Sequence, residues 1–379
     1  MAEGFRLEVV ARDGDARTGR LTTPHGVVET PAFMPVATYG AVRGISAEDL
    51  RTIGAQICLA NTYHLHERPG EGVIAGLGGL HGFTDWRGPW LTDSGGYQVT
   101  SLADRMQLEE AGVTFASPLD GKRRMLTPEG VIAIQEALGS DIAMVLDECL
   151  APHPPAGEPS ADSPAVRAAM ERTLRWAERS RAARKRPDQA VFGIVQGGVS
   201  HDLRRHSAGE TAAIGFDGYA HGGLGLGESR AQRSEAVVVA HAELPGEAPR
   251  YLMGLGRPVD LVDGVACGVD LFDCVVPTRN GRHGLLFTSQ GIISIKNARH
   301  RDDGEPVDPE CDCPACTHHS RAYLRHLIKC GESLGSRLAA LHNLRFYLRL
   351  LERTREAILN GTFAALRSEV EAIGEKRLA

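Results

Sequence analysis

The chain changes character within residues 271–283, which read Leu271-Phe272-Asp273-Cys274-Val275-Val276-Pro277-Thr278-Arg279-Asn280-Gly281-Arg282-His283. The first half is apolar enough for a buried strand, and we interpret the second half as a polar, basic loop. A carboxylate among apolar neighbours, such as Asp273, is poorly hydrated unless specific partners hold it. Arg279, Arg282 and His283 carry groups that bind phosphates. The segment therefore predicts a functional site, or alternatively a buried aspartate that only caps or pairs before an ordinary basic loop.

Similar apolar segments recur through the sequence before this one. Each ends in a polar residue or a glycine, and most are followed by a helix-like pattern. We predict eight strands, at residues 31–38, 56–61, 90–94, 142–148, 191–197, 219–223, 251–254 and 269–276. Eight parallel strands are what a closed barrel requires, so the predicted fold class is α/β, a (β/α)8 TIM barrel.

In such a barrel the polar strand ends share the C-terminal face, where active sites lie. These strand ends are Asn61, Asp93, Asp147, Gln196, Gly223, Gly254 and Asp273. Each of these residues, taken alone, could equally be a structural cap at the end of a strand. Three carboxylates around one opening repel one another unless a ligand or a proton relieves them, so together they indicate function.

Local signals place the elements between the strands. Helix starts are predicted at Ser46 with Asp49, at Thr127-Pro128 and at Ser163-Pro164, and a helix end at Gly139. We expect an opening hairpin in residues 5–28 and an inserted hairpin in residues 113–126. The proline-rich residues 150–164 are either a lid or a plain connection. The arginine-rich helix at residues 164–186 is expected to present a solvated face.

The composition bounds the class of protein. With 379 residues and 42% hydrophobic content, the chain can bury one large core or two modest ones. The formal charge of −6 argues against indiscriminate nucleic-acid binding but allows a local basic patch. The N-terminus has no apolar signal core and no run of ~18 apolar residues occurs, so we expect a cytoplasmic protein that does not enter a membrane.

A metal site is predicted where the barrel pattern has ended. Thiolates spaced as Cys311-x-Cys313-x-x-Cys316 can converge on one tetrahedral ion with little chain strain. The fourth ligand is open on spacing alone, with four candidates: His318, His319, His326 and His342. With no open position the ion would be a structural zinc. We predict a catalytic barrel with its N-terminal hairpin in residues 1–300, a zinc-binding subdomain in 301–346, and a helical segment packed on the barrel in 347–379.

Three glycine-rich segments predict a pocket for a flat heterocycle. They are Asp93-Ser94-Gly95-Gly96-Tyr97, Val195-Gln196-Gly197-Gly198 and Gly222-Gly223-Leu224-Gly225-Leu226-Gly227-Glu228. Glycine lets a ligand approach the backbone, Tyr97 can stack on a ring, and carboxylates accept from N–H groups while amides donate to a carbonyl. Each segment alone is more often a turn, and none matches a phosphate-binding fingerprint. Guanine has the required hydrogen-bonding pattern.

These segments, taken in order, resemble the bacterial tRNA-guanine transglycosylases. The resemblance also includes Leu146-Asp147-Glu148-Cys149, Phe272-Asp273-Cys274-Val275, Pro277-Thr278-Arg279 and the three cysteines with the distant His342. It covers nearly the whole chain and implies a (β/α)8 barrel with a zinc-binding insertion near the C-terminus, usually a homodimer. The implied reaction exchanges the wobble guanine of tRNAs with GUN anticodons for 7-aminomethyl-7-deazaguanine, in queuosine biosynthesis.

The resemblance also implies residue roles. Asp273 would be the nucleophile and Asp93 the general acid/base. The base would be bound by Ser94, Gly95, Gly96, Tyr97, Asp147, Cys149, Gln196, Gly223, Leu224, Glu228 and Met253. The tRNA would meet two segments, Gly254, Leu255, Gly256, Arg257, Pro258, Val259 and Asp260, and Thr278, Arg279, Asn280, Gly281 and Arg282, with Lys296 and Arg299 as further candidates. Cys311, Cys313, Cys316 and His342 would hold one structural Zn2+ per subunit.

Two positions depart from the family pattern. Leu226 stands where bacterial relatives usually have valine, which affects the room near the aminomethyl group. Arg257 stands where relatives often have lysine or threonine, which affects the grip on tRNA more than the chemistry. Cys149 keeps the bacterial character of the pocket wall, so we expect the aminomethyl precursor as substrate in preference to queuine.

Two alternatives belong to other classes. One is a catalytically silent, zinc-containing tRNA-binding subunit, against which the presence of both Asp93 and Asp273 argues. The other is an archaeal-type enzyme that modifies a base in the D-loop. We expect the bacterial reaction instead, because the sequence has no added RNA-binding domain after Ala379.

Overall fold

The computed structural model describes residues 2–96, 106–150, 162–374 and 376–378. A parallel sheet of nine segments forms its centre, in the order β4-β15-β14-β13-β12-β11-β7-β6-β5. These strands are β4 (Ala32–Met34), β5 (Val36–Ala37), β6 (Cys58–Ala60), β7 (Trp90–Thr92), β11 (Ile142–Met144), β12 (Ala190–Val195), β13 (Gly218–His221), β14 (Arg250–Leu252) and β15 (Leu271–Asp273).

The two edges of this sheet belong to one strand of the chain. Pro35 separates β4, which pairs with β15, from β5, which pairs with β6. The ring therefore closes as a barrel of eight strands in chain order, each paired in parallel with its neighbours. The predicted TIM barrel is confirmed. Each predicted strand range overlaps one strand of the ring, although β12, β13 and β14 each begin one residue before the predicted start.

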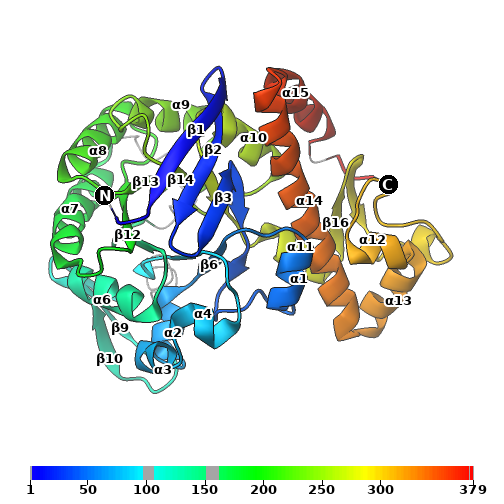
Figure 1. Ribbon diagram of the computed structural model, residues 1–379, viewed down its shortest axis with the longest axis horizontal. Coiled ribbons are helices and arrows are strands. Elements are labelled where there is room, and N and C mark those ends of the chain that lie inside the picture. Colours follow the sequence, from blue (N-terminus) through cyan, green and yellow to red (C-terminus); the bar gives the residue numbers. More distant parts are fainter. Residues whose placement is uncertain (1, 97–105, 151–161, 375, 379) are drawn as a thin grey trace.

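Helices surround the barrel (Figure 1). They are α1 (Ala47–Thr52), α2 (Thr62–Glu67), α3 (Glu71–Gly76), α4 (Gly79–Thr84), α6 (Pro128–Leu138), α7 (Pro164–Ala183), α8 (His201–Ile214), α9 (Arg230–His241), α10 (Pro258–Ala266) and α11 (Val276–His283). The capping predictions are confirmed: Ser46 and Asp49 form a capping box, and Thr127 and Ser163 cap α6 and α7 ahead of a proline. Gly139 ends α6 with a φ of 74°.

Three small antiparallel sheets are added to the barrel. The predicted opening hairpin is confirmed as β1 (Arg6–Asp13) and β2 (Ala16–Thr23), with β3 (Gly26–Thr30) as a third strand. The predicted inserted hairpin is confirmed as β9 (Gly112–Ala116) and β10 (Arg123–Leu126), joined by β8 (Gln107–Glu109). A further pair, β16 (Leu285–Thr288) and β17 (Gly291–Ser294), follows α11.

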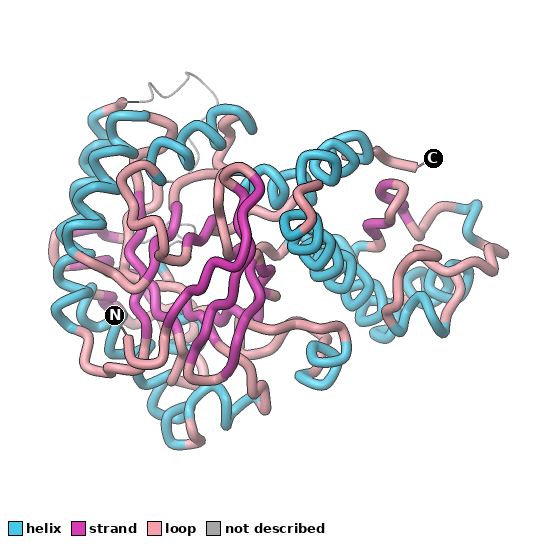
Figure 2. Tube along the Cα trace, turned by 45° about the horizontal axis from the view of Figure 1, so that its top comes forward, coloured by secondary structure: helices cyan, strands magenta, loops and turns pink. Residues whose placement is uncertain are grey.

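The first of these sheets covers the N-terminal end of the barrel. Arg17 of β2 forms a fully buried ion pair with Asp270, which immediately precedes β15. The amide of Ala2 donates to Asp217, immediately before β13. Figure 2 shows these strands lying across the barrel. The C-terminal end of the barrel is therefore the end left to a substrate.

The sequence predicted that the arginine-rich helix α7 presents a solvated face. In the structure several of its arginines are instead paired with acidic residues. Arg172 and Arg175 pair with Glu110 of the inserted sheet, and Arg179 pairs with Glu129 of α6. Arg184, just past the helix, pairs with the buried Asp217. The acidic partners belong to other segments of the chain. The ion pairs therefore attach α7 to the elements beside it. Most of the proline-rich loop predicted before α7 lies outside the described residues.

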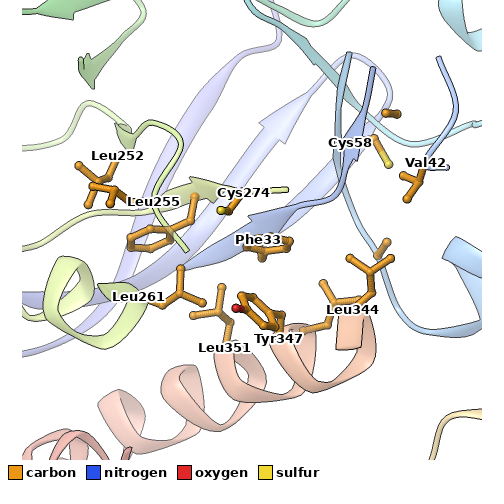
Figure 3. Close-up of a cluster of buried hydrophobic side chains, with 14 of the residues drawn as sticks. Phe33, Val42, Cys58, Leu252, Leu255, Leu261, Cys274, Leu344, Tyr347 and Leu351 are labelled. Atoms are coloured by element: carbon orange, nitrogen blue, oxygen red, sulfur yellow. The ribbon is translucent and has the colours of Figure 1, made fainter. Parts of the chain in front are cut away.

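The C-terminal region consists of η1 (Ala298–His300), α12 (Pro314–His318), α13 (Arg321–Cys330), α14 (Ser333–Leu359) and α15 (Phe363–Ile373). The long helix α14 lies between the barrel and the smaller elements (Figures 1 and 2). Its buried side chains Leu344, Tyr347 and Leu351 pack beneath Phe33 of β4 (Figure 3). Within the part of the chain that the structure describes, no helix is long and apolar enough to cross a bilayer.

The interpretation of residues 276–283 as a loop was wrong, because they form helix α11. Pro277 suits the first turn, Arg282 and His283 suit the last turn, and Gly284 ends the helix with a φ of 83°. Helix α11 packs closely on α14 at Gly281, where an added Cβ would lie 2.7 Å from the Ala339 oxygen. Tertiary packing against α14 thus orders a segment whose composition is that of a loop.

Candidate active site

Asp273 ends strand β15 at the C-terminal end of the barrel. Its Oδ1 accepts two hydrogen bonds, from the Tyr251 hydroxyl at 2.6 Å and from the Gly254 amide at 2.7 Å. Burial raises the pKa of Asp273, and these two donors oppose the increase. Among the described residues nothing hydrogen-bonds to Oδ2. One oxygen is therefore fixed and the other is available to a ligand.

Asp93 follows β7 and is equally well oriented. Asn61 donates to its Oδ2 at 2.5 Å, and the amides of Thr62 and Gly95 donate to its Oδ1 at 3.0 and 3.1 Å. Asn61 itself follows β6, the neighbouring strand. Two adjacent strand ends and the glycine turn after β7 thus hold this carboxylate, which is only half-buried.

Asp273 and Asp93 both act electrostatically on the same phenol, that of Tyr251. Burial raises the pKa of Tyr251 well above its ordinary value, and the negative charges of Asp273 and Asp93 raise it further. Both carboxylates therefore lie close to one side chain of β14, at one opening of the barrel. The structure brings together the two aspartates that are 180 positions apart in the sequence.

A buried polar pair follows the next strands. Asp147, after β11, accepts from Gln196 Nε2 at 2.7 Å and from Ser94 Oγ at 3.4 Å. Burial raises its pKa to about 6, although both donors oppose this. Cys149 lies beside this pair, and burial raises the pKa of its thiol to about 12, so it is a neutral wall of the site.

The glycines near Gln196 are required by its side chain. A Cβ on Gly223 would lie 2.4 Å from Gln196 Oε1, and one on Gly222 would lie 2.5 Å from Gln196 Nε2. Gly223 also has a φ of 67°, which other residues rarely adopt. Gly95 is equally constrained, since its Cβ would lie 2.9 Å from Tyr63 and its φ is 76°. Backbone and amide groups are thus packed as one polar wall.

Glu228 fixes the peptide between Leu224 and Gly225. Its carboxylate accepts from the amides of Gly225 at 2.5 Å and Leu226 at 2.9 Å. Arg233 of α9 holds Glu228 at 2.8 Å and also binds Asp260 at 2.7 Å. Because the Gly225 amide points to Glu228, the Leu224 carbonyl of the same trans peptide points the opposite way.

Sequence reasoning missed Arg204 and Tyr251. Arg204 of α8 is fully buried and donates to the carbonyls of Val195, Gly198 and Gly222, so it joins the loops after β12 and β13. Burial lowers its pKa to about 10. Nothing in the sequence distinguishes Arg204 from the exposed Arg205 beside it. Tyr251 looks like any aromatic residue in a buried strand.

The other predicted base-site residues are placed as follows. The Gly96 amide donates to Ser94 Oγ at 3.2 Å, and a Cβ added to Gly96 would lie 3.0 Å from the Asp147 carbonyl oxygen. Met253 follows β14 and is half-buried. Tyr97 lies outside the described residues.

The two segments predicted to meet tRNA differ in exposure. Gly254, Arg257 and Arg279 are exposed, and Pro258, Asn280 and Arg282 are half-buried. The remaining residues are buried: Leu255, Gly256, Val259, Asp260, Thr278 and Gly281. Burial and the positive charges of Arg43 and Arg279 lower the pKa of Arg282. Arg43, Arg279 and Arg282 therefore form a basic patch, in which Arg43 was not foreseen.

A second polar centre lies in the C-terminal region. The ligand atoms of Cys311, Cys313, Cys316 and His342 all lie within 4.8 Å of one another, and all four residues are buried. His342 Nδ1 faces Cys316 Sγ at 3.3 Å and Cys313 Sγ at 3.6 Å, while its Nε2 is 2.7 Å from the Phe287 carbonyl. A hydrogen bond from Nε2 leaves Nδ1 as the ligand atom. The cluster can hold a metal ion, and His342 is the histidine, among the four candidates, that meets the thiols.

A closed (β/α)8 barrel with this polar opening defines a TIM-barrel enzyme. The family described as Queuine tRNA-ribosyltransferase matches residues 13–375, and this chain belongs to it. A queuine tRNA-ribosyltransferase of Pseudomonas aeruginosa is 53% identical over 373 residues, 98% of either chain. The protein of that name from Stenotrophomonas maltophilia is 54% identical over 371 residues, 97% of either chain. That from Xanthomonas axonopodis is 54% identical over 366 residues, 96% of this chain and 94% of the relative.

Family membership confirms the resemblance that the motifs predicted. It makes the protein a transferase of the pentosyltransferase type, a tRNA-guanine transglycosylase of queuosine biosynthesis.

Proposed function

We propose that the enzyme replaces the wobble guanine of tRNAs with GUN anticodons by 7-aminomethyl-7-deazaguanine, through a covalent intermediate on Asp273. The observation that carries this proposal is the pairing of Asp273 and Asp93 around one opening. Glycosyl transfer with retention needs two carboxyl groups, one to form the covalent bond and one to move the proton.

In the first step, Oδ2 of Asp273 attacks C1′ of the ribose and the bond from C1′ to N9 breaks. The bonding electrons leave with the guanine, whose growing negative charge is stabilised by Gln196 and the Gly223 amide and whose N9 receives a proton from Asp93. In the second step, Asp93 takes the N9 proton of the incoming base. That nitrogen attacks C1′ and displaces Asp273, so the original configuration at C1′ is restored.

The polar wall suits the edges of a guanine-like base. Asp147 accepts from the N–H edge when it is ionised, and Gln196 with the Gly223 amide donates to the carbonyl. The Leu224 carbonyl, oriented by Glu228, faces away from the Gly225 amide and can accept from the aminomethyl group. Tyr97 and Met253 complete the site as the stacking residues, and Ser94, Gly95, Gly96 and Cys149 line it.

We propose that the tRNA is held at its anticodon loop. The wobble nucleotide must leave its stack to reach Asp273, which costs less in a loop than in a duplex. The patch of Arg43, Arg279 and Arg282, together with the exposed Arg257, supplies phosphate contacts close to the opening despite the net charge of −6.

The remaining predictions from the sequence complete the proposal. Three thiolates and one imidazole form a closed tetrahedral donor set, so we propose that the cysteine site holds one structural Zn2+ in each subunit. The proposed domains are residues 1–300, 301–346 and 347–379, with helix α14 spanning the last boundary. The resemblance supports a homodimer, which sedimentation can test, and a tRNA substrate supports a cytoplasmic location.

The test is incorporation of radiolabelled guanine into unmodified tRNA, together with detection of the covalent adduct on denaturing gels. Asp273→Ala should abolish the adduct and leave tRNA binding measurable. Asp188→Asn, at the opposite end of the barrel, is the control and should form the adduct normally. An adduct that survives in Asp273→Ala would refute the assignment. Tight tRNA binding without incorporation in the unaltered protein would favour the silent subunit, and a label in the D-loop would favour the archaeal-type reaction.

A further inference from the structure

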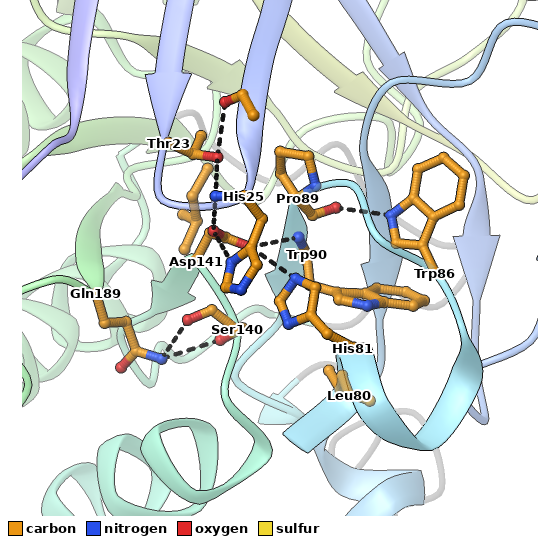
Figure 4. A network of polar contacts seen from close by, with 12 residues as sticks. Thr23, His25, Leu80, His81, Trp86, Pro89, Trp90, Ser140, Asp141 and Gln189 are labelled. Carbon is orange, nitrogen blue, oxygen red and sulfur yellow. Dashed lines mark hydrogen bonds and ion pairs between the residues drawn. The ribbon is translucent and has the colours of Figure 1, made fainter. Parts of the chain in front are cut away.

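A cluster of two histidines and one aspartate lies at the N-terminal end of the barrel, away from Asp93 and Asp273. Asp141 immediately precedes β11, His81 lies on α4, and His25 lies in the turn between β2 and β3. Their ligand atoms all lie within 4.8 Å of one another. Figure 4 shows both imidazole rings directed at the carboxylate of Asp141.

Each carboxylate oxygen of Asp141 faces one imidazole nitrogen. His25 Nδ1 is 2.8 Å from Asp141 Oδ1, and His81 Nε2 is 3.3 Å from Asp141 Oδ2. The two rings are stacked, with centroids 3.5 Å apart and planes inclined by 18°. Two protonated rings at this distance would repel each other, whereas two neutral rings can share one cation.

The side chain of His81 points to a missing partner. It is buried, and its Nε2 has no hydrogen-bond partner among the described residues, although it faces Asp141 at ion-pair distance. A buried polar atom in this state is unfavourable, because it has lost its hydrogen bonds to water and gained none in return. A metal ion between the rings and the carboxylate would satisfy it.

Backbone hydrogen bonds fix the orientation of the Asp141 carboxylate, as a metal ligand requires. It is fully buried, and the amides of Trp90 and His25 donate to it at 2.8 and 3.2 Å, one to each oxygen. Backbone donors thus orient the carboxylate without using its remaining lone pairs.

We propose that His25, His81 and Asp141 form a second metal site, which takes a divalent first-row ion of the zinc type. Tetrahedral zinc places ligand atoms about 3.3 Å apart, so the His25 ring has to move outward by only about 0.5 Å. The His25 side chain is 39% exposed, which gives the ion access to solvent and a water as fourth ligand.

The ion would stabilise the fold and would not take part in the reaction. The three ligands come from the β2–β3 turn, α4 and the start of β11, three segments far apart in the sequence. Residues at the N-terminal end of a TIM barrel serve stability. Bound metal would therefore fasten the N-terminal sheet to the barrel.

The test counts zinc in the full-length protein after equilibrium dialysis against a tenfold molar excess of zinc sulfate. The unaltered protein should hold two ions per chain, one at the cysteines and one here. His25→Ala, a change in an exposed turn that should not unfold the chain, should hold one. The matched control His201→Ala, which removes an exposed histidine on α8, should hold two.

A second measurement distinguishes the proposed metal site from the cysteine site. Co2+ added to protein that holds zinc at the cysteine site alone should give the weak visible bands of nitrogen and oxygen ligands, without thiolate charge-transfer absorption, and His81→Ala should abolish them. A single zinc per chain in the unaltered protein would overturn the proposal, because the triad would then be a hydrogen-bonded cluster only. So would a second zinc that persists in His25→Ala.

Discussion

The hydroxyl of Tyr251 donates a 2.6 Å hydrogen bond to Asp273, the carboxylate proposed to attack the ribose. The two residues belong to adjacent strands, β14 and β15. Burial raises the pKa of Asp273, and the phenol limits the increase. Because only the ionised carboxylate is a nucleophile, we expect Tyr251 to set the lower end of the pH range in which the enzyme works.

Tyr251→Phe should therefore move the acidic limb of kcat/KM to higher pH. A hydrogen bond to a charged group contributes about 1.5–3 kcal/mol, which corresponds to a rise of at least about one unit in the pKa of Asp273. The measurement is the pH profile of guanine incorporation. The control is Tyr219→Phe, whose hydroxyl faces the Phe216 amide instead. An acidic limb at the same pH in Tyr251→Phe would contradict the role.

Asp147→Asn should stabilise the fold and weaken base binding. The folded-state pKa of Asp147 is raised to about 6, so the native state binds more protons than the unfolded chain between about pH 4 and 6. Its contribution to stability therefore falls as pH rises through that window, and above it the ionised, buried form costs up to roughly 3 kcal/mol.

Urea denaturation of Asp147→Asn at pH 7 should show a higher free energy of unfolding, and the advantage should shrink at pH 4. The KM for guanine should rise, since the amide offers one acceptor where the carboxylate offers two. Equal stability at both pH values would show that Asp147 is not strained by its burial.

Gly281→Ala should destabilise the protein by about 1–3 kcal/mol, because the new methyl group would meet the backbone of α14 and force α11 away. An added Cβ would lie 2.7 Å from both the Ala339 oxygen and the Ala340 Cα. Gly209→Ala is the matched control: it is also helical but faces open space, so it should be neutral or stabilising. Thermal melting of both variants decides, and equal melting temperatures would contradict close packing of the helices.

Removal of the metal from the cysteine site should loosen the C-terminal region before it affects chemistry. His342 and Tyr347 lie on the same helix, and the Tyr347 hydroxyl donates to the Gly256 carbonyl near the Gly254 amide that holds Asp273. His342→Ala should therefore lower the melting temperature and expose residues 298–332 to proteases, with a smaller loss of adduct formation. His326→Ala, an exposed histidine on α13, is the control. Unchanged melting after verified metal removal would count against a structural role.

Local patterns were enough to predict the barrel. Apolar segments ending in polar residues, and caps such as Ser163-Pro164, depend on neighbours a few positions away, and the structure follows them. The same logic failed for residues 276–283, where a basic segment is helical because α14 packs on it. It also failed for α7, whose arginines meet acids from distant segments.

The sequence by itself determined the eight strands, the cysteine cluster and the candidate aspartates, because periodicity, ligand spacing and strand-end residues are local properties of the chain. Only the tertiary structure decided which histidine meets the thiols, that Arg204 joins two loops, that Tyr251 holds Asp273, and that His25, His81 and Asp141 converge. Each of these depends on side chains brought together by barrel closure across many intervening residues, and no pattern of neighbouring residues encodes such a distance.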